Sequence, residues 1–146
     1  MSIAVGSDHA GYELKEKVKQ YLERQNEEVN DFGCFSKSRV DYPDYAIQVA
    51  RSVIAGENKW GIIICGTGIG ISITANKIKG IRAALCCSEY MAKLARRHNN
   101  ANILAMGGRT TTPEEAEKIV KVFLNTNFEG GRHANRVEKI HALTGK

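Results

Sequence analysis

The residues best suited to chemistry lie in one glycine-rich stretch, Cys65-Gly66-Thr67-Gly68-Ile69-Gly70. Glycines between a strand and a helix let backbone N–H groups approach an anion closely. A cysteine beside such groups is a candidate base or nucleophile, because the positive potential stabilises its thiolate. Most free cysteines are instead small buried hydrophobes, and Thr67 could serve only the turn. The residues alone leave both interpretations open.

This stretch differs from the phosphate loops of nucleotide-binding proteins. No Gly-Lys-Ser/Thr follows it, as one would in a P-loop. Its G-x-G-x-G spacing also departs from the dinucleotide fingerprint, and it follows the third predicted strand instead of the first. We therefore expect no nicotinamide cofactor.

Polar residues also follow two other predicted strands. Asp8 and His9 come after the first strand, and Arg109 follows Gly107-Gly108 after the fifth. Parallel strands end at one edge of a sheet, where open α/β folds bind ligands, so we expect these residues beside Cys65. The structural alternative for Asp8 is a cap on the helix that follows, with His9 as a surface residue.

His98 and Asn99 end a helix that starts near Ser88. About twelve helical residues cover roughly 18 Å, which carries both side chains away from the Cys65 edge. If His98 is catalytic, it must serve the Cys65 site of a neighbouring subunit. The sequence thus predicts an active site shared in a symmetric dimer.

Arg132 and Arg136 follow another descending helix, and the same argument applies to them. His133 lies between them, where an anion site and a solvated helix face are both reasonable interpretations.

Five strand-like runs alternate with helical patterns along the chain. The strands are predicted at 3–6, 28–32, 61–65, 81–87 and 102–106. Apolar residues recur at helical spacing after the strands. The predicted core faces are Leu14, Val18, Tyr21 and Leu22; Ala46, Val49, Ala50 and Val53; Met91, Leu94 and Ala95; and Ala116, Ile119, Val120, Phe123 and Leu124. This alternation predicts an α/β fold, with a parallel five-stranded sheet and helices on both faces.

Local signals mark several helix starts. Pro43 suits a first turn, Ser88 is a candidate N-cap, and the run at 112–115 (Thr-Pro-Glu-Glu) combines an N-cap, a first-turn proline and a capping-box glutamate. Gly130-Gly131 precede a last helix at about 132–144.

Length and charge narrow the function classes. The 146 residues make one domain, 1–146, with 42% hydrophobic and 25% charged residues. Residues 1–90 hold eleven Lys/Arg and eleven Asp/Glu, so the net charge of +5 comes from residues 91–146, which hold ten and five. A basic C-terminal third indicates an anionic ligand. Nucleic acid is not expected, because no stacking platform, recognition helix or polybasic run is present; a small phosphorylated molecule fits better.

The four cysteines, at 34, 65, 86 and 87, have no zinc-ligand spacing. Free thiols fit a reducing compartment, and Cys86 and Cys87 are expected to be buried. No segment has the composition of a secretory signal or the length of a membrane span, so we expect the cytoplasm and no membrane partner.

Five blocks together resemble the type B ribose-5-phosphate isomerases, a family that includes galactose- and allose-6-phosphate isomerases. They are SDHAG near the start, DYPDYA at 41–46, CGTGIGISI at 65–73, RRHNNAN at 96–102 and EGGRHANRV at 129–137. The resemblance covers essentially the whole chain, in order. It implies a three-layer Rossmann-like sheet, no cofactor and no metal. It also implies a homodimer, possibly paired into a tetramer, with the C-terminal helix on the partner subunit.

The resemblance also implies roles for individual residues. Cys65 would move a proton between C1 and C2 through a cis-enediolate, assisted by Thr67, and Asp8 and His98 would open the sugar ring. Amides of Gly66, Gly68, Ile69 and Gly70 would hold the negative charge. The phosphate ligands would be His9, Arg109, Arg132 and Arg136, and the hydroxyl contacts would be Tyr42 and Asn99.

Two alternatives remain open at this stage. One is an isomerase of a six-carbon sugar phosphate or a free rare sugar, which pocket depth would decide. The other is a non-catalytic phosphosugar-binding protein on the same fold. That second alternative leaves the joint presence of Cys65, Thr67 and His98 unexplained.

Overall fold

Strands and helices alternate along the chain in the computed structural model, which describes residues 2–146. The strands are β1 (Ser2–Ser7), β2 (Glu28–Asp31), β3 (Trp60–Cys65), β4 (Ala83–Leu85) and β5 (Ile103–Gly107). The helices are α1 (Tyr12–Arg24), α2 (Tyr42–Ile54), α3 (Ile69–Ala75), α4 (Glu89–Asn99), α5 (Pro113–Asn125) and α6 (Arg132–Thr144).

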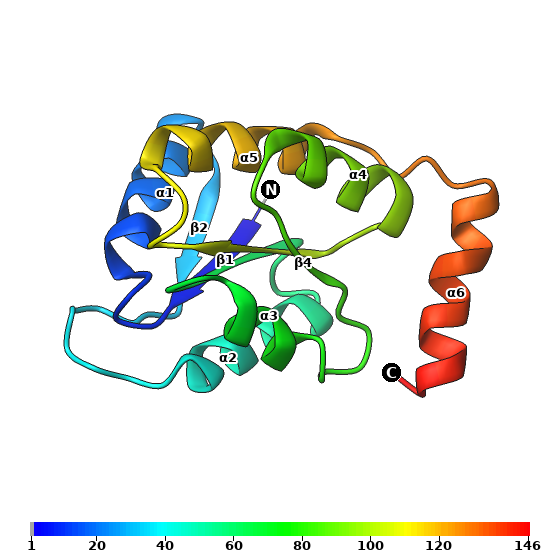
Figure 1. Cartoon of the computed structure of the whole chain (residues 1–146), viewed down its shortest axis with the longest axis horizontal. Coiled ribbons are helices and arrows are strands. Elements are labelled where there is room, and N and C mark those ends of the chain that lie inside the picture. The colour runs from blue at the N-terminus through cyan, green and yellow to red at the C-terminus, as the bar shows by residue number, and fades with distance from the viewer. Residues whose placement is uncertain (1) are drawn as a thin grey trace.

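The strands form one parallel sheet in the order β2-β1-β3-β5-β4. Helices α1, α4 and α5 cover one face, and α2 and α3 cover the other (Figure 1). Every residue of the central strand β3 is buried, as expected where helices cover both faces. The predicted three-layer α/β fold is confirmed.

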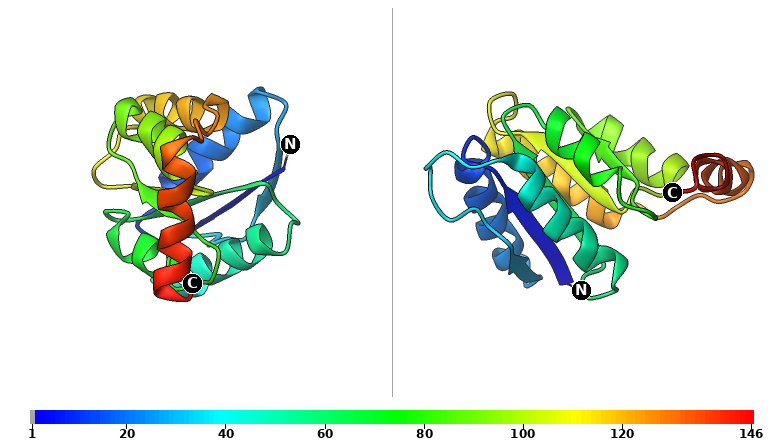
Figure 2. Two further views of the ribbon diagram at one scale, coloured as in Figure 1. Left: turned by 90° about the vertical axis from the view of Figure 1, so that its right-hand side faces the viewer. Right: turned by 90° about the horizontal axis from the view of Figure 1, so that it is seen from below.

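Helix α6 is not part of either layer. It stands beside the sheet and runs from the α4 layer toward the α2–α3 layer (Figure 2). Its buried residues are His133 and Val137, whereas Ile140 and Leu143 are 44% and 83% exposed. A cavity of about 500 Å³ separates α6 from the β4 side of the molecule, where Ile81, Arg82 and Ala83 contribute to its lining. No helix among residues 2–146 is long and apolar enough to cross a bilayer.

Each face of the sheet carries its own hydrophobic cluster. The α1–α5 side includes Trp60 and Phe123, whose rings meet edge to face at 5.7 Å. The α2–α3 side includes Val49, Ile63 and Ile103, all fully buried. Burying both faces fixes the strands, and with them the loops at the carboxyl edge.

The predictions near β4 were partly wrong. This strand spans three residues instead of 81–87, so Cys87 lies in the connection to α4 and is exposed. Met91, predicted to be in the core, is 43% exposed. Ala95 is buried as predicted, and Ala92 and Arg96 complete the buried face of α4. β4 is an edge strand, so it has a neighbouring strand, β5, on one side only.

Three helix starts were predicted correctly. Met91 N donates to Ser88 Oγ, Thr112 makes a complete capping box, and Pro43 lies in the first turn of α2. Asp8 does not cap α1, whose N-cap is Gly11. The Asp8 carboxylate instead accepts a hydrogen bond from Gly11 N at 3.0 Å and closes the preceding turn.

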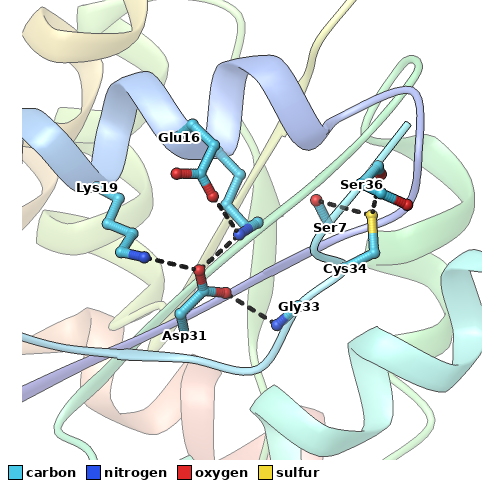
Figure 3. A network of polar contacts seen from close by, with 8 residues as sticks. Ser7, Glu16, Lys19, Asp31, Gly33, Cys34 and Ser36 are labelled. Atoms are coloured by element: carbon cyan, nitrogen blue, oxygen red, sulfur yellow. Dashed lines mark hydrogen bonds and ion pairs between the residues drawn. The ribbon is translucent and has the colours of Figure 1, made fainter. Parts of the chain in front are cut away.

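A buried ion pair fixes the chain where β2 ends. Lys15 is fully buried, and its Nζ lies 2.6 Å from Asp31 Oδ2, while Gly33 N donates to Asp31 Oδ1 at 2.8 Å (Figure 3). Lys19 contacts the same carboxylate at 3.1 Å. Burial raises the pKa of Asp31, but the hydrogen bonds from Lys15, Gly33 and Lys19 outweigh it and hold the pKa below its usual range. The pair anchors the segment that leads to Tyr42.

Asp31→Asn should destabilise the protein by roughly 2 kcal/mol, because the buried Lys15 loses its shortest ion pair and keeps only the contact with Glu16 at 3.0 Å. The carboxylate stabilises the fold above its unfolded pKa of about 3.9, and this contribution disappears as the pH falls below that value. Urea unfolding of both proteins between neutral and acid pH should therefore show their stabilities converging as the pH falls. Glu117→Gln breaks the exposed pair with Arg24 and should cost under about 1 kcal/mol. Equal costs for the two variants would contradict the assignment.

Candidate active site

The carboxyl ends of β1, β3 and β5 bring three predicted site segments together. Asp8 N donates to the carbonyl of Ile64, the residue before Cys65, at 3.2 Å. Gly108 N donates to Cys65 O at 2.7 Å, and Arg109 N to Gly66 O at 2.9 Å. These bonds continue the sheet register beyond the strands, which is why the three segments share one edge.

The Cys65 thiol is held by the glycine-rich loop. Its side chain is buried, and Gly68 N donates to Sγ at 3.2 Å. Ile69 N donates to Thr67 Oγ1 at 3.2 Å, so the loop also fixes the threonine hydroxyl. Thr67 itself is exposed, as a group that meets a ligand must be. The loop thus holds both the Cys65 thiol and the Thr67 hydroxyl at the carboxyl end of β3.

The remaining cysteines offer no comparable environment. Burial raises the pKa of Cys86 to about 12, so that thiol stays protonated at neutral pH. Cys34 is buried and its Sγ lies 3.9 Å from Ser7 Oγ. Cys65 is thus the cysteine placed for chemistry.

Two more predicted residues border the same edge. His9 Nδ1 lies 3.2 Å from both the carbonyl oxygen and the amide nitrogen of Val40, which ties the 33–41 loop to β1. The Tyr42 ring covers Gly70, where an added Cβ would lie 2.5 Å from Tyr42 Cζ. At Gly66 an added Cβ would lie 3.2 Å from Arg109 Nη1, so that guanidinium also faces the loop.

The second group of predicted residues lies at the opposite edge of the sheet. After α4, Asn102 O accepts a hydrogen bond from Gly61 N, at the start of β3. Cys65 is four residues further along β3, or roughly 13 Å. His98 and Asn99 at the end of α4, with Arg132 and Arg136 at the start of α6, therefore form a cluster apart from Cys65.

That second cluster contains a residue whose role the sequence analysis missed. Glu129 lies within 4.0 Å of His98 and 3.8 Å of His133. His133 is 5% exposed, so its interpretation as part of a solvated helix face was wrong. Its ring packs against His98 because α6 begins beside the end of α4. The available signal was an acidic residue within a basic segment, directly before Gly130-Gly131.

Among residues 2–146, these three side chains form the one set of three close metal-ligating groups. The ligand atoms of His98, Glu129 and His133 lie within 4.8 Å of one another. The rings of the two histidines are nearly parallel, at 10°. Parallel rings direct their in-plane lone pairs side by side and not toward one point, so this arrangement does not suit a shared ion.

Gly68→Ala should remove most activity and destabilise the protein. Gly68 has φ +80°, and an added Cβ would meet Leu85 Cδ1 at 2.5 Å and Met106 C at 2.9 Å. Gly56 is the matched control, because it has φ +78° with nothing within 4 Å of an added Cβ. Gly56→Ala should cost about 1–2 kcal/mol from its backbone conformation alone and leave kcat unchanged. Thermal unfolding and steady-state rates of both variants test this; equal stability and activity in the two would contradict it.

The chain is similar to known proteins over nearly its whole length. Residues 3–140 match the Ribose/Galactose Isomerase family. The chain is 50% identical over 141 residues to ribose-5-phosphate isomerase B of Escherichia coli, covering 97% of this chain and 95% of that protein. The structure of the Clostridium thermocellum ribose-5-phosphate isomerase B superposes with a TM-score of 0.98 at 50% identity, covering 99% of this chain and 98% of that one.

A further solved structure bears on the ligand. The Mycoplasma genitalium ribose-5-phosphate isomerase B, with bound ribulose-5-phosphate, superposes with a TM-score of 0.93 at 44% identity, covering 99% of this chain and 97% of that one. These matches span nearly all of each chain compared. The chain belongs to the Ribose/Galactose Isomerase family.

Proposed function

We propose that this protein is an aldose–ketose isomerase that interconverts D-ribose 5-phosphate and D-ribulose 5-phosphate. The observation that carries the proposal is the Cys65 thiol, held at 3.2 Å by the Gly68 amide at the ligand edge of the sheet. The family membership and the ribulose-5-phosphate bound to the Mycoplasma genitalium relative support the substrate.

In the proposed reaction the Cys65 thiolate removes the C2 proton of the open-chain aldose. The electron pair forms the C1–C2 double bond, and the aldehyde oxygen becomes the negative oxygen of a cis-enediolate. Backbone amides of Gly66, Gly68, Ile69 and Gly70 stabilise that charge. The O2 proton then passes to the negative O1, the Cys65 thiol gives its proton to C1, and the ketose forms with a C2 carbonyl and a C1 hydroxyl.

Other residues of the proposed site open the ring and bind the substrate. Asp8 and His98 move the protons that open the furanose, and Thr67 assists Cys65. The phosphate ligands are His9, Arg109, Arg132 and Arg136, since guanidinium groups match phosphate geometry. Tyr42 and Asn99 contact the sugar hydroxyls.

The proposed site needs two subunits, because His98 and Cys65 lie at opposite edges of the sheet. The apolar residues exposed on α4 and α6 support a homodimer. They are Tyr90, Met91, Ile140 and Leu143. In this proposal the chain is one domain, 1–146, whose C-terminal helix packs on the partner, with pairing into tetramers possible.

The chemistry proposed for these residues needs neither a metal nor a cofactor. The ligand is a small sugar phosphate and not a nucleic acid, and the proposed location is the cytoplasm. The free thiols support a reducing compartment.

Initial rates with ribose 5-phosphate, allose 6-phosphate and galactose 6-phosphate, all in EDTA, test the proposal. We expect ribose 5-phosphate to give the highest kcat/KM of the three. A preference for a six-carbon substrate would replace the proposed substrate. Binding of ribose 5-phosphate without turnover of any sugar phosphate would favour a non-catalytic binding protein.

A further inference from the structure

Two histidines from different helices stack where α4 ends and α6 begins. The ring centroids of His98 and His133 are 4.2 Å apart, with 10° between the ring planes. His133 is 5% exposed, whereas 37% of the His98 side chain is exposed. In this stack the His133 ring is therefore buried, and the His98 ring is accessible to solvent.

The Glu129 carboxylate borders the edges of both rings. Its Oε2 is 4.0 Å from His98 Nε2, and its Oε1 is 3.8 Å from His133 Nε2. Arg97 fixes this carboxylate, with Nη2 at 3.0 Å and Nε at 3.1 Å from Oε2, and the Glu129 amide donates to Arg97 O. Glu129 is thus held independently of the two histidines.

Burial and the neighbouring positive charges both disfavour the protonated form of His133. Burial lowers the pKa of His133, and His98, Arg132 and Arg136 lower it further against the opposing effect of Glu129. Among the described residues, His133 Nε2 is a buried atom without a hydrogen-bond partner. A neutral ring at this position packs against His98 without repelling a proton on it.

We propose that His133 and Glu129 are positioning residues for His98. The buried ring of His133 fixes the plane of the His98 imidazole by stacking, and the Glu129 carboxylate fixes its Nε2 edge. This inference rests on the role proposed above for His98 in opening the substrate ring.

Comparing the forward and reverse reactions distinguishes ring opening from proton transfer between C2 and C1. Ribose 5-phosphate is stored as a furanose, which must open before C2 can react. Ribulose 5-phosphate cannot close in the same way, because its C5 oxygen carries the phosphate. At saturating substrate, a defect in ring opening therefore lowers the forward kcat more than the reverse kcat, because the reverse reaction can release the open-chain aldose, which closes in solution.

The test compares His133→Leu with His133→Phe. Leucine fills the buried position without a flat ring, and phenylalanine restores the ring without nitrogens. We expect His133→Leu to lower forward kcat by roughly tenfold or more and the reverse kcat much less, because a displaced proton-transfer group is costly. His133→Phe should recover most of the forward rate. Val137→Ala, at another buried position of α6, should change stability without changing the forward-to-reverse ratio.

A second variant does not depend on the buried core. Glu129→Ala removes a carboxylate that is 44% exposed, and it should lower the forward kcat more than the reverse kcat, because His98 loses the group that borders its Nε2 edge. Equal forward and reverse losses in His133→Leu or in Glu129→Ala, or no recovery in His133→Phe, would each overturn the inference. Full forward activity in His98→Ala would instead overturn the role proposed for His98 itself.

Discussion

Cys65→Ala should lower the isomerisation rate by roughly a thousandfold or more, because a positioned general base contributes a rate factor of that size. The thiol is buried, and Gly68 N points at its sulfur from 3.2 Å. Cys86 cannot replace it, since Cys86 is buried on the opposite face of the sheet. Steady-state rates with ribose 5-phosphate measure the loss.

Two controls separate chemistry from folding in that experiment. Cys87→Ala changes an exposed cysteine and should leave kcat unchanged. Isothermal titration of Cys65→Ala with ribose 5-phosphate should still show binding, because the proposed phosphate ligands are intact. Substantial turnover by Cys65→Ala would assign the proton transfer to another group.

Mixing inactive Cys65→Ala and His98→Ala proteins should restore about a quarter of the wild-type activity after subunit exchange. Random exchange makes half of the dimers mixed. One of the two shared sites in each mixed dimer then has an intact Cys65 and an intact His98. Activity should return because Cys65 and His98 lie at opposite ends of β3. The chain just after His98 contacts Gly61, near the start of β3, whereas Cys65 is its last residue.

The matched control mixes Cys65→Ala with the double variant Cys65→Ala/His98→Ala. Every site then lacks Cys65, so no activity should return. Native mass spectrometry verifies the exchange itself. If the first mixture stays inactive although mixed dimers are present, each site is contained within one subunit.

The carboxyl-edge half of the candidate site could be predicted from the sequence. Once the strands are assigned, parallel topology alone places Asp8, Cys65 and Arg109 at one edge. The separation of His98 from Cys65 follows in the same way from the length of one helix. These predictions needed no knowledge of side-chain packing.

What the sequence did not reveal depends on tertiary contacts. Lys15 looks like a surface residue of α1, yet it is fully buried because Asp31 and the rings of Tyr12 and Phe35 surround it. The burial of His133 depends on how α6 meets α4, which no local pattern encodes. Met91 lies on the same helix face as Leu94 and Ala95, but that face extends beyond β4, an edge strand of only three residues, and Met91 is exposed.

Proton NMR of ribose 5-phosphate turnover in D₂O containing EDTA tests the central claim most directly. A metal-independent isomerase that works through an enediolate should produce ribulose 5-phosphate with solvent deuterium at C1. Deuterium should also enter C2 of the remaining ribose 5-phosphate as the reaction reverses. No conversion by the folded protein in EDTA would contradict the proposed reaction, and the fraction of product that carries deuterium measures how often the Cys65 proton exchanges with solvent before it reaches C1.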